Sequence, residues 1–241
     1  MTGYRLRTLA AGAALLAASP AAAFAQSAQG GTPPTALPTE TLVPPGWRLE
    51  FETRGHLDGD EREDLVLVLH QDDPKNFDPD YARGGYGTDT NPRRLIVALG
   101  DADGYRVIAS NDTLIPRRNS PVLDEPIKEA PTIHGGLLTV GLGYMVSAGG
   151  GAIGSYDYRF YVRNDEVYLA SLETGMTANR IDRIYRKVWM DFVDGYGLEV
   201  VSDFEEISPR SRLIRMEPRA ISLAEVGNGF DFAFGPWLPP A

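Results

Sequence analysis

The stretch that decides the fold is His56-Leu57-Asp58-Gly59-Asp60-Glu61-Arg62-Glu63-Asp64, which runs directly into Leu65-Val66-Leu67-Val68-Leu69-His70. The first part is a short acidic loop in which carboxylates recur at alternate positions. The second part has five consecutive apolar residues, a pattern typical of a strand that is covered on both faces. We therefore predict that the acidic loop leads into a central strand of a sheet.

Residues on both sides of this stretch alternate between apolar and polar, as in half-buried strands. Alternation broken by turn residues predicts strands near 47–53, 94–99, 105–109, 137–144, 156–162 and 167–172. Two hairpins are expected, around Asp101–Gly104 and around Asn164–Glu166. Helical periodicity is scarce, and no segment repeats at a fixed period, so a full propeller is not expected. The sequence predicts a mainly β domain of antiparallel sheet, sandwich-like or a partly open barrel, with little helix.

The last third of the chain allows more than one interpretation. Apolar spacing over 178–188 is compatible with an amphipathic helix, whereas 183–193 also has the pattern of a strand. A short helical turn is expected over 220–226. A last strand is predicted from three phenylalanines that alternate with other residues, Phe230, Phe232 and Phe234.

Residues 1–25 have the features of a secretory signal peptide. Arg5 and Arg7 precede an apolar run, and Ala23-Phe24-Ala25 supplies small residues for cleavage. The run is too short to cross a bilayer, which takes about 20 residues. Residues 26–46 are rich in proline and predict a disordered linker, so a single β-rich domain is expected over 47–241. We expect a periplasmic or secreted bacterial protein without membrane insertion after signal cleavage.

The charge balance narrows the choice of partners. The formal net charge is −10, and loss of Arg5 and Arg7 with the signal makes it −12. So acidic a protein is repelled by nucleic acid and by anionic membrane surfaces. The chain contains no cysteine, so no disulfide can form. The sequence therefore predicts no nucleic-acid binding and leaves the partner open, with a protein or a glycan of the cell envelope as candidates.

The acidic loop has the residue spacing of a calcium-binding loop. Calcium takes oxygen ligands from alternate positions of a tight loop, with a backbone carbonyl at the seventh position. Counted from His56, these positions hold Asp58, Asp60, the carbonyl oxygen of Arg62, and Asp64. Imidazole is a poor calcium ligand because hard cations select oxygen. A hydrogen-bonded acidic turn is therefore the favoured interpretation, and bound calcium is the alternative.

The same residues carry a resemblance to a known family. Residues 55–68 resemble the FG-GAP or VCBS-type repeat, in which a glycine and an acidic loop run into an Asp-Leu-aliphatic strand. The strand at 93–97 and the turn at 103–105 fit the layout of uncharacterised secreted bacterial proteins with one such motif. The resemblance implies a β hairpin, often with calcium in its loop, and implies no known activity. Glu61 stands where the family usually has glycine.

Other motifs give little support for catalysis. Gly149–Gly154 satisfies G-x-G-x-x-G, but a strand follows it, so we expect a flexible loop and no nucleotide cofactor. The three histidines lack the spacing of zinc ligands, and no G-x-S-x-G elbow is present. The long connection Gln71–Pro92 carries five acids, Asp72, Asp73, Asp78, Asp80 and Asp89. Long loops are often functional, so a hydrolase that uses these acids stays an alternative.

Aromatic residues gather around the second predicted hairpin, at Tyr144, Tyr156, Tyr158, Phe160, Tyr161 and Tyr168. By alternation, half of them should lie in the core. The other half, with Arg159 and Arg163, could form a platform for carbohydrate or peptide, or ordinary cross-strand pairs. We therefore expect a non-enzymatic binding or structural module of the cell envelope. The alternative is a cell-envelope hydrolase acting on a carbohydrate or peptide.

Overall fold

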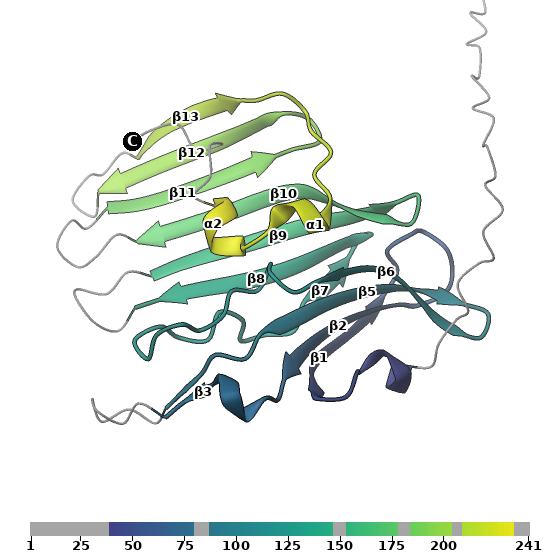
Figure 1. The fold of residues 1–241 in the computed structure, drawn as a ribbon. Coiled ribbons are helices and arrows are strands. Elements are labelled where there is room, and N and C mark those ends of the chain that lie inside the picture. Colours follow the sequence, from purple (N-terminus) through teal and green to yellow (C-terminus); the bar gives the residue numbers. More distant parts are fainter. Residues whose placement is uncertain (1–38, 80–86, 147–152, 178–183, 204–208, 234–241) are drawn as a thin grey trace, which may run out of the picture. The chain divides into compact units, whose positions relative to one another are not determined.

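A computed structural model describes residues 39–79, 87–146, 153–177, 184–203 and 209–233 (Figure 1). The chain divides into two units, Met1–Pro33 and Pro34–Ala241, and all described residues belong to the second. The predicted signal peptide and most of the predicted linker lie outside the described residues. None of the helices in the described ranges is long and apolar enough to cross a membrane.

The first sheet has four antiparallel strands in the order β1-β2-β5-β6. Their bounds are β1 (Trp47–Gly55), β2 (Asp64–Gln71), β5 (Arg93–Asp101) and β6 (Gly104–Asn111). The apolar run of the opening stretch forms β2, which has a neighbour on each side. The prediction of a central strand is thus confirmed. A short pair follows β2, made of β3 (Phe77–Asp78) and β4 (Thr88–Asp89).

The second sheet has seven strands, and each is hydrogen-bonded antiparallel to its neighbour in the sequence. They are β7 (Thr132–His134), β8 (Leu137–Met145), β9 (Ile153–Arg163), β10 (Glu166–Thr177), β11 (Ile184–Asp191), β12 (Tyr196–Asp203) and β13 (Arg210–Arg215). Neither sheet closes into a barrel. A mainly β, antiparallel fold is confirmed, and of the two predicted architectures the structure has the sandwich-like one.

Strand β2 packs on both of its faces. Val66 and Val68 belong to the large apolar cluster that the two sheets share, which also contains Tyr158 and Phe160 of β9. Leu65, Leu67 and Leu69 point the other way into a smaller cluster. All five apolar residues of β2 are fully buried, and burial of each stabilises the fold by roughly 1.5–3 kcal/mol. Because a slip of one residue would exchange the two faces, this burial fixes the register of the sheet.

The smaller cluster is covered by residues that the sequence assigned to the linker. A turn of 3-10 helix, η1 (Thr39–Leu42), precedes β1, and Leu42 is buried against β2 and β5. Packing therefore begins before Trp47, and the prediction that the linker extends through residue 46 is wrong in its last part. Leu42 and Val43 stand alone among prolines and threonines. Two apolar residues show no periodicity, so the sequence could not predict this contact.

The C-terminal segment has two short helices, α1 (Leu223–Val226) and α2 (Gly229–Ala233), which contact β10 and β9 (Figure 1). The helical turn predicted over 220–226 is confirmed. The strand predicted from the alternating phenylalanines is wrong, because Phe230 and Phe232 lie in α2. The side chain of Asn228 accepts hydrogen bonds from the backbone N–H groups of Phe230 and Asp231 and starts this helix. Phe234 lies outside the described residues.

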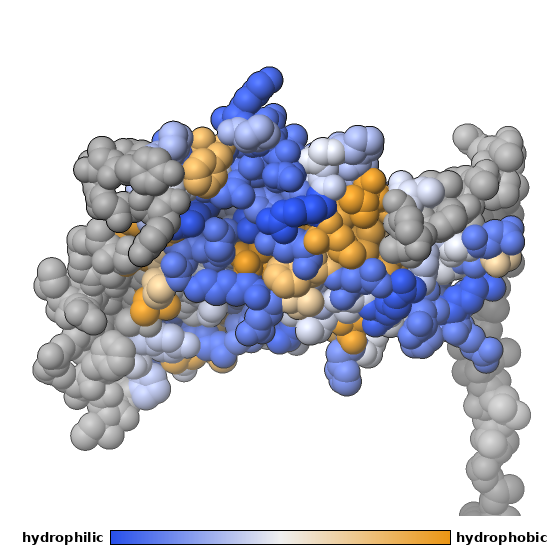
Figure 2. Space-filling view, turned by 90° about the horizontal axis from the view of Figure 1, so that it is seen from below, coloured by the Kyte–Doolittle hydropathy of each residue, from blue (hydrophilic) through white to orange (hydrophobic). Residues whose placement is uncertain are grey.

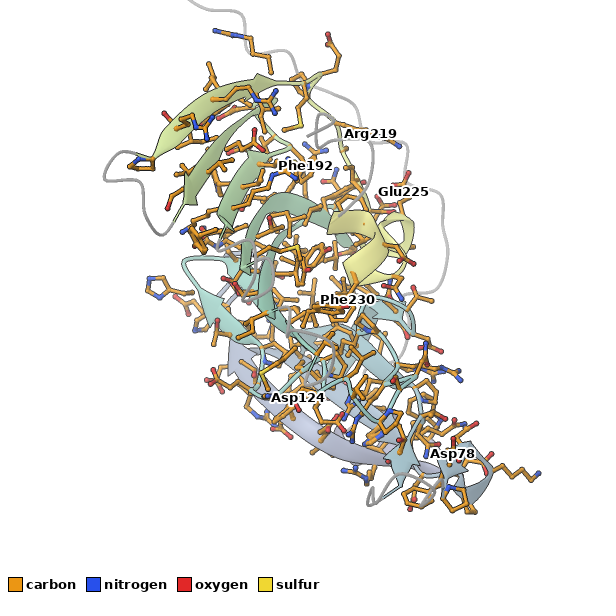
Figure 3. All side chains as sticks on the ribbon, turned by 90° about the vertical axis from the view of Figure 1, so that its left-hand side faces the viewer. Asp78, Asp124, Phe192, Arg219, Glu225 and Phe230 are labelled. Atoms are coloured by element: carbon orange, nitrogen blue, oxygen red, sulfur yellow. The ribbon has the colours of Figure 1, made fainter. Side chains whose placement is uncertain are left out.

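Aromatic contacts explain why the helix replaces a strand. The ring of Phe230 packs edge-on against Tyr144 and also against Tyr156, with centroids 5.3 Å apart in both cases. The ring of Phe232 contacts Tyr158 and Phe192. Figure 3 shows Phe230 among the side chains of the core. The helical turn thus places both rings over the large cluster. These contacts come from residues distant in sequence, so the alternation of Phe230, Phe232 and Phe234 could not predict them.

Residues 184–191 form a strand, β11, in a region where the sequence also allowed a helix. β11 begins at Ile184 and pairs with β10 and β12 on its two sides. The remainder of the proposed helix, 178–183, lies outside the described residues. The face shown in Figure 2 is mainly hydrophilic around apolar areas of limited size, as expected for an acidic chain.

Gly100 allows the end of β5 to approach the acidic loop. A Cβ atom at this position would lie 2.7 Å from the carbonyl oxygen of Glu63 and 2.9 Å from Cβ of Arg62. We expect Gly100→Ala to lower the free energy of unfolding by about 1–3 kcal/mol, because backbone must move to admit the methyl group. Urea denaturation measures this change. Gly143→Ala is the matched control, since no atom lies within 4 Å of its added Cβ; an equal loss in both variants would contradict the prediction.

Candidate functional site

The acidic loop is held by hydrogen bonds among its own residues. One carboxylate oxygen of Asp58 accepts a hydrogen bond from the backbone N–H of Asp60 at 3.0 Å. Asp60 in turn accepts from the backbone N–H of Arg62 at 2.7 Å and pairs with the guanidinium of Arg62 at 2.8 Å. The ring Nδ1 of His56 lies 3.0 Å from the carbonyl oxygen of Arg62. Three of the predicted ligands therefore already have partners inside the turn.

Asp64 is the buried anchor of this loop. Its side chain is fully buried, and its two oxygens accept from the backbone N–H groups of Leu57 at 2.6 Å and of Gly100 at 2.9 Å. Burial raises the pKa of Asp64, and the two backbone hydrogen bonds oppose that rise. The carboxylate thus ties the start of the loop to the end of β5.

These contacts describe a hydrogen-bonded turn without a ready cavity for a cation. Within the described ranges, no group of three or more His, Cys, Asp and Glu side chains is placed to hold a metal ion. The sequence prediction that Asp58, Asp60, the carbonyl of Arg62 and Asp64 bind calcium stays a prediction.

The acids of the connection between β2 and β5 serve mainly as local acceptors. Asp73 accepts from the backbone N–H of Lys75 at 3.0 Å and begins a short 3-10 turn, η2 (Pro74–Asn76). Asp89 accepts from the backbone and side chain of Asn91. Asp80 lies outside the described residues. Asp73 and Asp89 therefore have local hydrogen-bond donors within the connection.

A buried network of charges lies next to this connection. Arg93 is only 4% exposed and pairs with Glu50 through two hydrogen bonds, at 2.7 and 3.0 Å, and with Glu125 at 2.9 Å. His70, also buried, has Nδ1 against Arg48 and Nε2 3.4 Å from a carboxylate oxygen of Asp89.

This network acts as a unit of stability. Burial, and then the charge of Arg93, lower the pKa of His70, so the ring is neutral at pH 7. Removing one partner would leave a buried charge unpaired, which is strongly destabilising. Nδ1 of His70 contacts Arg48, whereas Nε2 is buried without a hydrogen-bond partner among the described residues.

The outer face of the seven-stranded sheet, opposite the large cluster, carries both charged and apolar side chains. Cross-strand pairing from β8 to β13 places six residues in one line, which we call the central row: Gly141, Asp157, Glu173, Trp189, Leu198 and Leu213. At a strand spacing of ~4.8 Å this row is about 24 Å long. It joins two carboxylates to an indole and two leucines on one flat surface.

The apolar half of the central row is unusually exposed. Leu198 is 43% exposed and Leu213 57%, and the neighbouring Tyr196 is 39% exposed. The rings of Trp189 and Tyr196 meet edge-on with centroids 5.3 Å apart. Exposed apolar side chains that gather in one place mark binding surfaces.

The polar half of the row lies beside a row of small residues. This adjacent row contains Gly143, Ser155 and Gly175, which pair across β8, β9 and β10, and it continues to Lys187 of β11. An added Cβ atom would meet nothing within 4 Å at Gly143. At Gly175 it would lie 3.1 Å from Oγ of Ser155 and 3.5 Å from the hydroxyl oxygen of Tyr185, so side chains lie beside this end of the row.

The two carboxylates of the central row influence one another. Burial, and then the charge of Glu173, raise the pKa of Asp157. Glu173 is paired with the ammonium group of Lys187 at 2.5 Å. A row with hydrogen-bonding carboxylates at one end, and the half-buried Trp189 beside the exposed Tyr196 at the other, can bind a ligand that has both hydroxyl groups and apolar faces.

The sequence predicted that the aromatic residues around the β9–β10 hairpin lie half in the core and half on a surface platform. Tyr156, Tyr158 and Phe160 are fully buried, so the core half of that prediction is confirmed. Tyr161 and Tyr168 stack with centroids 5.7 Å apart, and Arg163 lies over both rings. The central row itself was missed. Its signal is a separation of 16 residues between Gly141, Asp157, Glu173 and Trp189, which follows from hairpins of matched length.

Replacing the anchor of the acidic loop tests its structural role. We expect Asp64→Asn to lower the free energy of unfolding by about 2 kcal/mol, because the amide can accept at one oxygen only and leaves a buried N–H unpaired. Chemical denaturation of both proteins at pH 7 measures the loss.

The pH dependence provides a second readout of the same variant. A raised pKa means that the folded protein binds the proton of Asp64 more tightly than the unfolded chain does. Proton binding by Asp64 therefore stabilises the folded state fully below pH 3.8. This stabilisation is lost as the pH rises from 3.8 through the raised pKa of Asp64. The difference in stability between wild type and Asp64→Asn should change over this window, and a constant difference would contradict a raised pKa.

Calcium titration tests the remaining ligand prediction. Because the loop oxygens already accept hydrogen bonds, we expect the melting temperature to stay constant up to millimolar calcium. A rise that Asp60→Ala abolishes, and that the off-loop variant Asp72→Ala keeps, would instead establish the loop as a calcium site.

Comparisons with protein-family models, with curated proteins and with solved structures found no match. The resemblance of residues 55–68 to the FG-GAP or VCBS-type repeat therefore stays a prediction.

Proposed function

We propose that this chain is a periplasmic or secreted, non-enzymatic binding module that holds a neutral polysaccharide of the cell envelope. The central row carries this proposal. Sugar rings present apolar faces that pack on exposed aromatic side chains, as Trp189 and Tyr196 can provide. Their hydroxyl groups donate well to ionised carboxylates, which Asp157 and Glu173 supply in the same line.

The charge of the protein supports a neutral ligand. With a formal net charge of −10, the chain repels anionic polymers, and two carboxylates stand in the proposed site. In this proposal the acidic loop, which resembles part of the FG-GAP or VCBS-type repeat, is a structural turn. The proposed location in the cell envelope rests on the expected signal peptide.

A hydrolase is the second candidate, and one observation favours it. Asp157 and Glu173 are direct cross-strand neighbours, and the pKa of Asp157 is raised. Glycoside hydrolases use two carboxyl groups, one of them protonated by a raised pKa. Both residues lie in a row that also contains the exposed Leu198 and Leu213, which a binding surface uses and hydrolysis does not require. The surface therefore supports binding better than cleavage.

Isothermal titration calorimetry with cellotetraose and with chitotetraose tests the proposal. We expect Trp189→Ala to weaken binding at least roughly tenfold, equivalent to about 1.4 kcal/mol, through loss of the half-buried ring. Phe77→Ala is the control, because Phe77 is an exposed aromatic residue in β3, outside the seven-stranded sheet. Binding that is absent in wild type, or equal in both variants, would contradict the proposal.

The same oligosaccharides separate binding from hydrolysis. We expect no release of new reducing ends during prolonged incubation with wild type. Release that disappears in Asp157→Asn while the melting temperature is unchanged would show that the second candidate is right.

A further inference from the structure

The last strand of the seven-stranded sheet, β13, has a free edge. It is the terminal strand in the sheet order, and among the described residues it pairs only with β12 (Figure 1). All of its residues except Ile214 are exposed. Of the strands and helices in the described ranges, only β12 packs extensively along β13, whereas β7, at the opposite edge, also packs against β1. Such an edge leaves N–H and C=O groups open to a further strand.

The hydrogen bonds to β12 determine which backbone groups of β13 face outward. The N–H of Met216 donates to the carbonyl oxygen of Gly195 at 3.0 Å, and this bond continues the register between β12 and β13 without a shift. In an antiparallel ladder, residues at alternate positions of a strand bond to the same neighbour. Even-numbered residues of β13 therefore bond to β12, and odd-numbered residues turn their N–H and C=O groups to the free edge. The odd-numbered residues are Ser211, Leu213 and Arg215.

Two copies of this edge are complementary when Leu213 lies opposite itself. A two-fold axis at Leu213 pairs Ser211 of each copy with Arg215 of the other, so outward-facing groups meet outward-facing groups along the whole strand. The remaining arginines of the strand then meet apolar residues: Arg212 meets Ile214, and Arg210 meets Met216.

The neighbouring registers are less favourable. An axis at Arg212 would place two guanidinium groups directly opposite one another, which destabilises a strand pair. An axis at Ile214 would pair Ser211 with Glu217, which lies beyond the end of β13. The order of residues in β13 thus favours pairing centred on Leu213.

Charged side chains on an edge strand usually prevent pairing, but the central arginine of β13 is held on its own sheet. The Nε and Nη2 atoms of Arg212 donate to one carboxylate oxygen of Glu199 in β12, at 2.9 and 2.6 Å. The same carboxylate accepts from Nε of Arg186 in β11 at 2.6 Å. The guanidinium of Arg212 therefore lies toward β12 and leaves the edge open.

The outer face next to this edge is apolar. Leu213 is 57% exposed, and its neighbour Leu198 in β12 is 43% exposed. Exposed apolar side chains that lie together mark interaction surfaces. When Leu213 meets its counterpart, each leucine covers part of the other, which gives the pair a contact beyond its backbone hydrogen bonds.

We propose that two copies of this chain pair through their β13 edges, antiparallel about a two-fold axis at Leu213. The two seven-stranded sheets then form one continuous sheet. Their central rows join end to end at Leu213 and give a single row about 53 Å long at a strand spacing of ~4.8 Å. The pairing itself is independent of glycan binding. That the joined row takes a longer glycan than one copy can hold rests on the proposed function.

Sedimentation equilibrium of the full chain without sugar tests the pairing. We expect a mass of two chains that falls toward one chain on dilution. Leu213→Lys should weaken association at least roughly tenfold, because two ammonium groups would lie directly opposite at the axis. Leu198→Lys makes the same charge change in the same row, one strand away from the edge, and should associate as wild type does. Unchanged melting temperatures confirm that both variants fold.

Single cysteines test the register, because the chain has no cysteine of its own. Leu213→Cys should form a disulfide-linked pair under mild oxidation, since Cα atoms of a hydrogen-bonded pair lie about 5.5 Å apart, within disulfide reach. Ser211→Cys should not, because its counterpart would lie about 14 Å away. A mass of one chain at every concentration, equal weakening in the two lysine variants, or equal cross-linking of the two cysteine variants would overturn the proposal.

Discussion

The two hydrogen bonds accepted by the buried carboxylate of Asp64 are the contact on which the four-stranded sheet depends. They join Leu57, at the start of the acidic loop, to Gly100, at the end of β5. Between these points runs β2, whose side chains fill both apolar clusters. An acid in a fully buried position is costly unless its oxygens are satisfied. Here the backbone satisfies them, and the loop, β2 and β5 are fixed relative to one another.

The two sheets differ in which of their faces are buried. The central strands of the four-stranded sheet, β2 and β5, are buried on both faces, and the motif that resembles a calcium loop leads into β2. The seven-stranded sheet buries one face and leaves the other free, with Trp189 and the exposed Leu198 among charged neighbours. Function is therefore proposed for a surface far in sequence from the most recognisable motif. That motif explains how the domain is built, and the outer face is where we propose that the domain binds its ligand.

Local patterns predicted the strands well because alternation and turn residues act over a few positions. The apolar run of β2 and the turn at Asn164 and Asp165, both at positive φ, belong to this class. Leu42 and Phe230 were misjudged because distant residues decide their environment. The central row depends on the register of five strand pairs, including the bulge between Leu169 and Ser171. A shift in any of these pairings would break the row, and a shift in the β9–β10 or β10–β11 pairing would separate Asp157 from Trp189, so only the folded chain reveals the site.

The measurement that tests the account most directly is a map of backbone amide shifts by nuclear magnetic resonance while cellotetraose is added. Proposed binding on the outer face predicts the largest shifts at Glu173, Trp189 and Leu198, together with the indole N–H of Trp189. The amides of Leu57 and Gly100, which Asp64 holds on the other sheet, should not move. Shifts confined to the acidic loop, or an unchanged spectrum at millimolar sugar, would contradict the account.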